Sequence, residues 1–415
     1  VYGQDVDDFW RDHPVDSGAD CGDGAVYKRL AAAIDAGDRG RTDHRPHDIV
    51  GEQIEYCHAV AGLPFGDRLL KDFPVLCGDQ VIALQRLKLT SSIWRRRKRK
   101  ANEMRAVGLM THGGPEVLEV VDVPEVHTGP GQVRLKVYAA AVNPTDTMAR
   151  NGSRAAEQKA DPPPYIPGMD AAGIVDEIGD GVTTGVAVGD RVMAMVCPKG
   201  RHGAYREQIV LDQRAVVSAP AGTSHVEACT LPMNGLTARQ SLDLLGLSVG
   251  QVVAVTGAAG AYGGYVIQLA KADGLMVIAD ASPADRDLIK RLGADIIVKR
   301  GDDVAERFRE HYPKGVDGVA DGAVLNEKVI AAVKDGGAFT SVRRFIGEPQ
   351  RDIRFTATSV RDYDCEYEKL DCLRQQAETG ILTLRVAEAM PAANASEAHR
   401  RLEAGGTRGR LVLEF

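Results

Sequence analysis

The sequence has few residues that would support a disulfide framework and no stretch that would cross a membrane. Its seven cysteines are scattered, odd in number and never spaced as Cys-x-x-Cys, which is typical of reduced thiols in a cytoplasmic protein. No apolar run approaches the ~20 residues of a membrane helix, and the aspartate-rich residues 1–23 lack the apolar core of a signal peptide. We therefore expect a cytoplasmic protein without a membrane partner.

The 51 basic residues (Lys and Arg) are outnumbered by 58 acidic residues (Asp and Glu). The net charge of −7 argues against a general nucleic-acid binder. One basic run, residues 95–100, lies in a segment that is also rich in acidic residues, and we interpret it as part of a solvated tail. A tether to nucleic acid or to an anionic membrane is the alternative. Glycine is abundant, at 45 residues, and together with 44% hydrophobic residues this composition suits an α/β protein with many turns.

Residues 1–103 differ from the rest of the chain. Apolar periodicity is weak there, so the segment offers little surface to bury against the entropy cost of ordering it. Both tryptophans, Trp10 and Trp94, lie in it. We expect a poorly ordered extension that is dispensable or foreign to the natural protein, because strand patterns begin at Met104, a possible initiator. The competing hypothesis is a regulatory arm that binds a partner.

A glycine-rich stretch has the pattern strand, turn, helix, strand. An apolar run from Val252 is followed by three glycines at intervals of three residues, then by an amphipathic helical segment at 265–271 and a second apolar run. A turn this tight needs residues without a Cβ, so that backbone N–H groups can approach a pyrophosphate at the helix N-terminus. The context predicts dinucleotide binding. The predicted cofactor contacts in the turn are Gly257, Ala258, Gly260, Ala261, Tyr262 and Gly263.

Patterns on either side of this unit predict two domains. From Met104, many short alternating strands separated by Gly and Pro indicate a small β-barrel-like domain. From Val226, strands alternate with helices, which is typical of a doubly wound parallel sheet with ligands at the carboxyl ends of its strands. The chain then returns to a helix at 397–402 and a strand at 410–415. The expected strands of the parallel sheet are 252–255, 276–279, 296–298, 318–320, 338–342 and, at its edge, 353–358.

Several motifs follow one another in a recognisable order. They are MRAVGLMTHGGPEVLEV, AAAVNPTDTMARNG, PYIPGMDAAGIVDEIG, VGDRV, LPMNGLTA, GAAGAYGG and GRLVL. From residue 104 onward the chain therefore resembles the zinc-free, zeta-crystallin-like quinone oxidoreductases of the medium-chain dehydrogenase/reductase superfamily. The resemblance implies an α/β fold with a GroES-like β-rich catalytic domain, residues 104–225 and 360–415, and a Rossmann NADPH-binding domain, residues 226–359. It also implies an active site in the cleft between them and a homodimer formed through the edge strand at 353–358.

The motifs depart from those of the family's zinc-dependent relatives. Where those relatives carry a zinc-binding Cys, this chain has an Asn-Pro-Thr stretch that begins at Asn143. Where they carry Gly-His-Glu, it has Gly168, Met169 and Asp170. The cysteines of this region lack the spacing of ligands. We therefore expect no metal.

Without a metal, the expected reaction is hydride transfer from NADPH to a small acceptor that is already polarised, a quinone or an α,β-unsaturated carbonyl. The resemblance places Asn143 and Thr237 at the nicotinamide and Asp146 in the same loop as Asn143, and these are the predicted catalytic residues. An ordinary Asn-Pro turn, a helix start and a loop contact are their alternatives. Tyr165 and Arg150 would line the substrate entrance. The alternative functions are an alkenal or enoyl reductase of secondary metabolism and a non-catalytic NADPH-binding protein.

The residues after the second strand bear on the choice between NADH and NADPH. Asp280 lies near the ~20-residue spacing at which a carboxylate holds the adenosine ribose and selects NAD. Side chains alternate along a strand, however, and the position that the family's NAD enzymes use is Ala281. Ser282 and Arg286 follow, as in NADPH-dependent members, and Lys299 would add a second cation. A solvated helix-start charge is the alternative for Arg286. We expect NADPH, with NADH as the alternative supported by Asp280.

Overall fold

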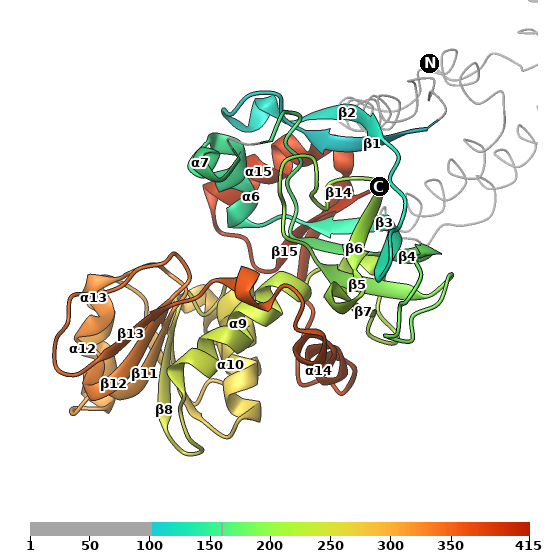
Figure 1. The fold of residues 1–415 in the computed structure, drawn as a ribbon. Helices are drawn as coiled ribbons and strands as arrows, with labels where there is room; N and C mark the ends of the chain where they lie inside the picture. Colours follow the sequence, from blue (N-terminus) through green and yellow to red (C-terminus); the bar gives the residue numbers. More distant parts are fainter. Residues whose placement is uncertain (1–101, 159–160) are drawn as a thin grey trace, which may run out of the picture. The chain divides into compact units, whose positions relative to one another are not determined.

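The computed structural model describes residues 102–415, except for 159–160 (Figure 1). The expectations for residues 1–101, which concern the extension, its basic run and both tryptophans, lie outside the described residues. Within the part that is described, no helix is long and apolar enough to cross a membrane.

A six-stranded sheet forms where the sequence alternates strands with helices. Its strands are β8 (Val252–Thr256), β9 (Met276–Ala281), β10 (Ile296–Lys299), β11 (Val316–Asp321), β12 (Val333–Ser341) and β13 (Arg354–Ala357). All neighbours pair in parallel, in the order β10-β9-β8-β11-β12-β13. Numbered along the chain this is 3-2-1-4-5-6, the dinucleotide-binding order, whose direction reverses between β8 and β11. The expected Rossmann sheet is thereby confirmed.

Helices cover both faces of this sheet. They include α9 (Pro232–Leu245), α10 (Ala261–Ala272), α11 (Arg286–Arg291), α12 (Val304–His311) and α13 (Glu327–Ile330). Val253 and Val255 belong to one buried cluster and Ala254 to another, as alternation along a strand buried on both faces requires. The helix expected at 265–271 begins earlier, at Ala261, because Gly260 already serves as its N-cap.

A second sheet combines strands from both ends of the described chain. Its strands are β3 (Gln132–Ala141), β4 (Asp170–Ile178), β5 (Arg191–Met195), β6 (Gln208–Asp212), β7 (Val216–Ser218), β14 (Val386–Pro391) and β15 (Arg410–Glu414). β15 pairs antiparallel with β3, so the last strand completes the sheet that begins nearly three hundred residues earlier. In Figure 1 the red C-terminal strands lie beside blue-green β3. The expected GroES-like part of the fold is confirmed over residues 129–236.

A two-stranded sheet and several helices complete the described fold. A hairpin-like pair, β1 (Glu103–Gly108) and β2 (Glu119–Pro124), forms where the first strand is expected. The strand expected from Tyr165 starts only at Asp170, because Pro167 has no N–H to donate and Gly168 has a φ of +106°. The remaining elements are α6 (Pro144–Asn151), α7 (Ala155–Gln158), α8 (His225–Ala228), α14 (Tyr367–Glu378), α15 (Ala395–Ala404), η1 (Pro115–Val117), η2 (Gln213–Ala215), η3 (Pro283–Asp285), η4 (Val360–Tyr363) and η5 (Ala392–Asn394).

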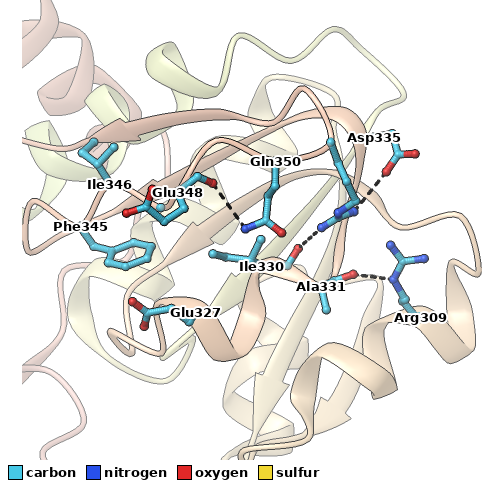
Figure 2. Close-up of a pocket in the computed structure, with 11 residues that line it drawn as sticks. Arg309, Glu327, Ile330, Ala331, Asp335, Phe345, Ile346, Glu348 and Gln350 are labelled. Carbon is cyan, nitrogen blue, oxygen red and sulfur yellow. Dashed lines mark hydrogen bonds and ion pairs between the residues drawn. The ribbon is translucent and has the colours of Figure 1, made fainter.

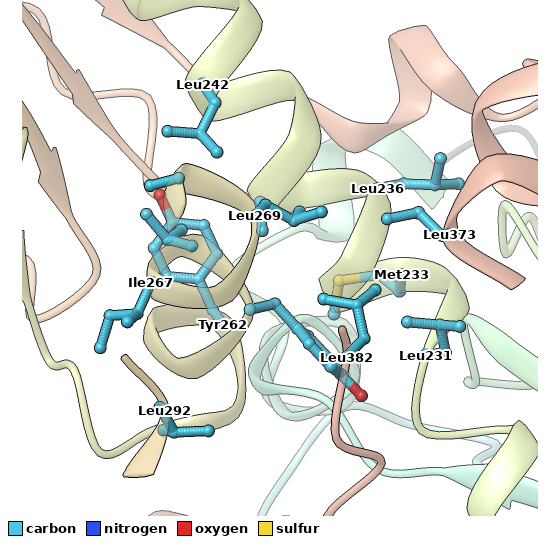
Figure 3. Packing of buried hydrophobic residues seen from close by; sticks show 14 of the residues in the cluster. Leu231, Met233, Leu236, Leu242, Tyr262, Ile267, Leu269, Leu292, Leu373 and Leu382 are labelled. Atoms are coloured by element: carbon cyan, nitrogen blue, oxygen red, sulfur yellow. The ribbon is translucent and has the colours of Figure 1, made fainter. Parts of the chain in front are cut away.

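One buried apolar cluster joins the two sheets through α9 and α10. Figure 3 shows Leu231, Met233 and Leu236 of the α9 region among the packed side chains, with Leu269 of α10 nearby. The same cluster includes Met169, which directly precedes β4. This packing holds the start of α9 against the start of β4, and the polar residues of the candidate site lie at that junction.

Candidate functional site

The glycine turn between β8 and α10 has the backbone that a pyrophosphate cradle requires. Gly257 has a φ of +64°, a left-handed value that side chains rarely adopt. A Cβ on Gly263 would lie 2.5 Å from the carbonyl oxygen of Gly257, so a side chain does not fit there. Gly260 is the N-cap of α10, and the first N–H groups of a helix have no partner within it. The turn therefore fits a dinucleotide.

The other predicted residues of the turn differ in how they are used. Ala258 is buried, and its N–H donates to the Asp280 carboxylate at 3.0 Å. Ala261 is the first residue of α10. The ring of Tyr262 is buried, and its hydroxyl donates to Ser241 at 2.8 Å. Tyr262 thus helps to fix the turn on α9, and a contact of its side chain with cofactor stays a prediction.

Asp280 supports the turn from within the protein. Its side chain is buried and accepts the hydrogen bond from Ala258. Burial raises the pKa of Asp280, while the N–H of Ala258 lowers it. The carboxylate on which the NAD alternative depends is therefore used, at least in part, to hold the glycine turn.

Exposed cations lie at the carboxyl ends of β9 and β10. Arg286 begins α11, and its guanidinium donates to the carbonyl oxygen of Ile297 at 3.2 Å. Lys299, the last residue of β10, pairs in register with Ala281. The sequence analysis missed Arg300, whose charge lowers the pKa of Asp280 and whose N–H donates to Ala281 at 2.9 Å. The sequence gives one indication that Arg300 belongs to this group of cations, namely that it directly follows Lys299.

Ser282 lies beside these cations, and its hydroxyl already has a protein partner. It donates to Asp285 at 2.6 Å, and Asp285 is paired with Arg408 from the segment before β15. Arg385, which the sequence analysis also missed, donates to the carbonyl oxygens of Ala259 and Gly260. The C-terminal return thus contacts the glycine turn and the end of β9 directly.

Asp170 is the centre of a buried polar cluster at the junction of the two sheets. Its carboxylate accepts hydrogen bonds from the side-chain amide of Asn143 at 2.9 Å and from the guanidinium of Arg410 at 3.0 Å. It also accepts from the N–H of Met233, at the start of α9, at 2.6 Å. A carboxylate is stabilised at a helix N-terminus. Burial raises the pKa of Asp170, and the Arg410 charge opposes this.

Asn143 is wholly buried within this cluster. Its Nδ2 donates to Asp170, and its Oδ1 accepts from Arg410 at 2.6 Å. Both ends of the amide therefore have protein partners, and a contact with cofactor or substrate stays a prediction. The sequence analysis noted Asp170 where zinc enzymes have Glu and placed Arg410 in the motif GRLVL and the last strand, but it assigned neither residue a role in the site. The partnership of the three residues depends on the tertiary fold.

Asp146 holds the loop that carries Asn143. Its carboxylate accepts hydrogen bonds from the N–H groups of Asn143 and Gly168, at 2.8 and 3.0 Å, and from the hydroxyl of Tyr205 at 3.1 Å. Burial raises the pKa of Asp146 to about 6. These contacts match the loop-holding alternative for Asp146, whereas its catalytic role is a prediction without a supporting contact.

Thr237 lies one helical turn after Met233 in α9. Its hydroxyl donates to the Met233 carbonyl oxygen at 2.5 Å. A hydroxyl has one hydrogen and two lone pairs, so Thr237 retains the capacity to accept a hydrogen bond.

The two residues expected at the substrate entrance are placed differently. Tyr165 is half-buried and stacks on His112, with ring centroids 5.2 Å apart. Arg150 is buried and donates through both terminal nitrogens to Glu403 of α15. Arg150 therefore ties α6 to α15, and its predicted position at an entrance lacks a supporting contact.

The described residues were expected to lack a metal site, and a cavity elsewhere in the fold does not involve the predicted site residues. Within 102–415, the described positions contain no group of three His, Cys, Asp or Glu side chains placed to hold a metal ion. A cavity of about 560 Å³ lies beside α13 and β12, with Arg309 and Phe345 among its lining residues (Figure 2). None of the predicted site residues lines this cavity. This cavity is therefore not the predicted cofactor or substrate site.

Substitution of Asp170 should show how strongly the junction depends on it. Asp170→Asn leaves the Arg410 guanidinium buried without its counter-charge, and breaking a buried pair costs about 3–5 kcal/mol. We expect the free energy of unfolding, from urea denaturation at pH 7, to fall by that amount. Asp212→Asn is the control, because Asp212 and Arg214 form an exposed pair worth about 0–1 kcal/mol. Equal effects of the two substitutions would contradict the interpretation.

Known proteins resemble this chain in both halves. Residues 129–236 match the alcohol dehydrogenase GroES-like domain, and residues 292–413 match a zinc-binding dehydrogenase domain. An NADPH-dependent alkenal/one oxidoreductase of Arabidopsis thaliana, a chloroplastic protein, is 32% identical over 270 residues, 63% of this chain and 67% of that protein. The chain spans about two thirds of the length of such curated relatives.

Solved structures extend the similarity over both sheets. An NAD-dependent alcohol dehydrogenase is 32% identical, with a TM-score of 0.67 over 75% of this chain and 100% of that one. The quinone oxidoreductase of Coxiella burnetii is 30% identical, with a TM-score of 0.65 over 75% of this chain and 99% of that one. The chain therefore belongs to the zeta-crystallin-like quinone oxidoreductase family, within the medium-chain dehydrogenase/reductase superfamily of oxidoreductases.

Proposed function

We propose that this oxidoreductase uses NADPH, without zinc, to reduce quinones or α,β-unsaturated carbonyl compounds in the cytoplasm. The observation that carries the proposal is the charge pattern beyond β9 and β10. Arg286, Lys299 and Arg300 are exposed there, whereas Asp280 is buried beneath the glycine turn. A 2′-phosphate is favoured by exposed cations, and the ribose of NAD is favoured by a free carboxylate.

The residues of this chain would bind and orient the reactants. Bound NADPH supplies the hydride. The glycine turn would hold its pyrophosphate, and Thr237 would accept a hydrogen bond from its carboxamide. The Asp170 cluster fixes the start of α9, and with it Thr237, relative to the loop of Asn143. A quinone or an enone is polarised before reaction, so a dedicated general acid is less necessary.

The acceptor class is supported by the named activities of relatives. The Arabidopsis protein is named for alkenals and enones, and the Coxiella protein for quinones. Both acceptors delocalise the charge that forms when hydride adds. An enoyl reductase of secondary metabolism and a non-catalytic NADPH-binding protein are the alternatives, and a screen of turnover separates them. We further infer that the catalytic domain comprises residues 104–225 and 360–415, and the cofactor domain 226–359.

Turnover tests the proposed reaction. Purified protein should oxidise NADPH, followed by absorbance, in the presence of a small ortho- or para-quinone or a short alkenal. EDTA or 1,10-phenanthroline should leave the rate unchanged, because no step depends on a bound metal. Loss of the rate in chelator, with recovery on adding zinc, would refute the metal-free reaction. Binding of NADPH without turnover of any acceptor would favour the non-catalytic alternative.

Arg286→Ala tests the cofactor preference. A charge-assisted hydrogen bond contributes about 1.5–3 kcal/mol, so KM for NADPH should rise roughly tenfold to a hundredfold while KM for NADH changes little. Lys290→Ala is the matched control, because it removes an exposed cation from the same helix α11. A wild-type preference for NADH would contradict the proposal and leave Asp280 as the selecting residue.

We also propose a homodimer formed through β13, the last strand of the parallel sheet. β13 pairs with β12 on one side and is the terminal strand in the sheet order. An edge strand has unpaired N–H and C=O groups that a second copy can satisfy. Light scattering at micromolar concentration should give twice the mass of the chain. A monomeric mass would count against this assembly.

A further inference from the structure

Asp285 is held in a strong ion pair just beyond the end of β9. Arg408 donates to both carboxylate oxygens, with Nε 2.5 Å from Oδ1 and Nη2 2.8 Å from Oδ2. Asp285 is only 5% exposed. The hydrogen bonds from Arg408 hold the pKa of Asp285 below its ordinary value, so the carboxylate stays ionised. Asp285 therefore places a negative charge beside the predicted phosphate site.

This charge opposes a 2′-phosphate in two ways. The Ser282 hydroxyl has one hydrogen, and it donates that hydrogen to Asp285 at 2.6 Å. A phosphate at Ser282 would therefore compete with Asp285 for the same donor. A phosphate bound at Ser282 and the Asp285 carboxylate, both negatively charged, would also repel each other. Unless its negative charge is neutralised, Asp285 would therefore favour binding of NADH over NADPH.

Arg408 supplies the neutralising charge. A bidentate guanidinium is the strongest common partner of a carboxylate. With Asp285 neutralised, the cations that remain at the strand ends are Arg286, Lys299 and Arg300. Arg408 comes from the segment before β15, so the charge is supplied by the catalytic half of the chain. Arg408 also lines a cavity of about 560 Å³ together with Arg291 and Arg385, whose positive charges outnumber that of the one acidic lining residue, Glu227.

We propose that Arg408 is a specificity-determining residue that admits the 2′-phosphate of NADPH by neutralising Asp285. The proposal rests on the NADPH preference proposed above. Arg408 acts through Asp285 and is thus a positioning residue. The competing explanation is a clamp between η3 and the C-terminal segment, in which case loss of the pair would weaken the binding of both cofactors alike.

Binding measured by isothermal titration calorimetry separates these explanations. NADP+ and NAD+ are titrated into wild type, Arg408→Gln, Asp285→Asn and the double variant. We expect Arg408→Gln to raise Kd for NADP+ roughly tenfold and to change Kd for NAD+ less than about twofold. Asp285→Asn should bind NADP+ at least as tightly as wild type. In the Asp285→Asn background, the Arg408→Gln effect should disappear, because there is no charge left to neutralise.

Two further variants serve as controls. Arg408→Lys keeps the charge and should retain most of the NADP+ affinity. Arg400→Gln removes an arginine whose partner is Glu397, on the exposed side of α15, and should leave both Kd values unchanged. Circular dichroism reports whether each variant is folded. If Arg408→Gln does not fold, the charge-retaining Arg408→Lys and Asp285→Asn variants still test the proposal through the ratio of the two Kd values.

Distinct outcomes overturn distinct claims. An equal rise of both Kd values in Arg408→Gln would establish the clamp instead. A tenfold loss that persists in the double variant would show that Arg408 acts without Asp285. A wild-type protein that binds NAD+ more tightly than NADP+ would contradict the NADPH preference itself. That comparison uses the wild-type protein alone, so a failure of the proposed NADPH preference is distinguishable from a failure of the proposed role of Arg408.

Discussion

The junction between the two sheets depends on one buried ion pair. Asp170 and Arg410 lie far apart in the sequence, and each is almost inaccessible to solvent. Burying two charges is costly, so such a pair persists only when further hydrogen bonds satisfy it. Asn143 and the N–H of Met233 supply those bonds. Because these four groups come from four separate elements, the pair fixes the relative position of the loop, the last strand and the helix that carries Thr237.

Much of the fold could be predicted because its determinants are local. The glycine turn needs its conformation whatever surrounds it, as the φ of Gly257 shows. The strands of the parallel sheet are short apolar runs between turn residues, and they occur within a few residues of the expected positions. The first and last residues of helices and strands were less predictable than their existence. The helix expected from residue 265 starts at Ala261, since a glycine-rich start has little apolar periodicity to reveal it.

The candidate site was predictable in its residue types and less so in their partners. Asn143 and Asp146 were singled out, but the structure uses their polar atoms to hold Asp170, Tyr205 and the loop backbone. Arg408 and Arg410 were not singled out as site residues. Both reach the site from the end of the chain, and no local pattern indicates which distant carboxylate an arginine will meet.

The partners of three buried carboxylates help to explain how an acidic chain can offer a phosphate site. Asp280 is bonded to a backbone N–H, Asp285 to Arg408, and Asp170 to Arg410. Each of these acids is engaged by a different partner, and all three are buried. The exposed cations at the ends of β9 and β10 are Arg286, Lys299 and Arg300, and exposed Asp287, Asp302 and Asp303 lie near them. Two of these acids are also engaged, Asp302 by Lys328 and Asp303 by Arg307, in a chain whose net charge is −7. Local pairing, and not overall composition, decides which sign of charge a ligand meets there.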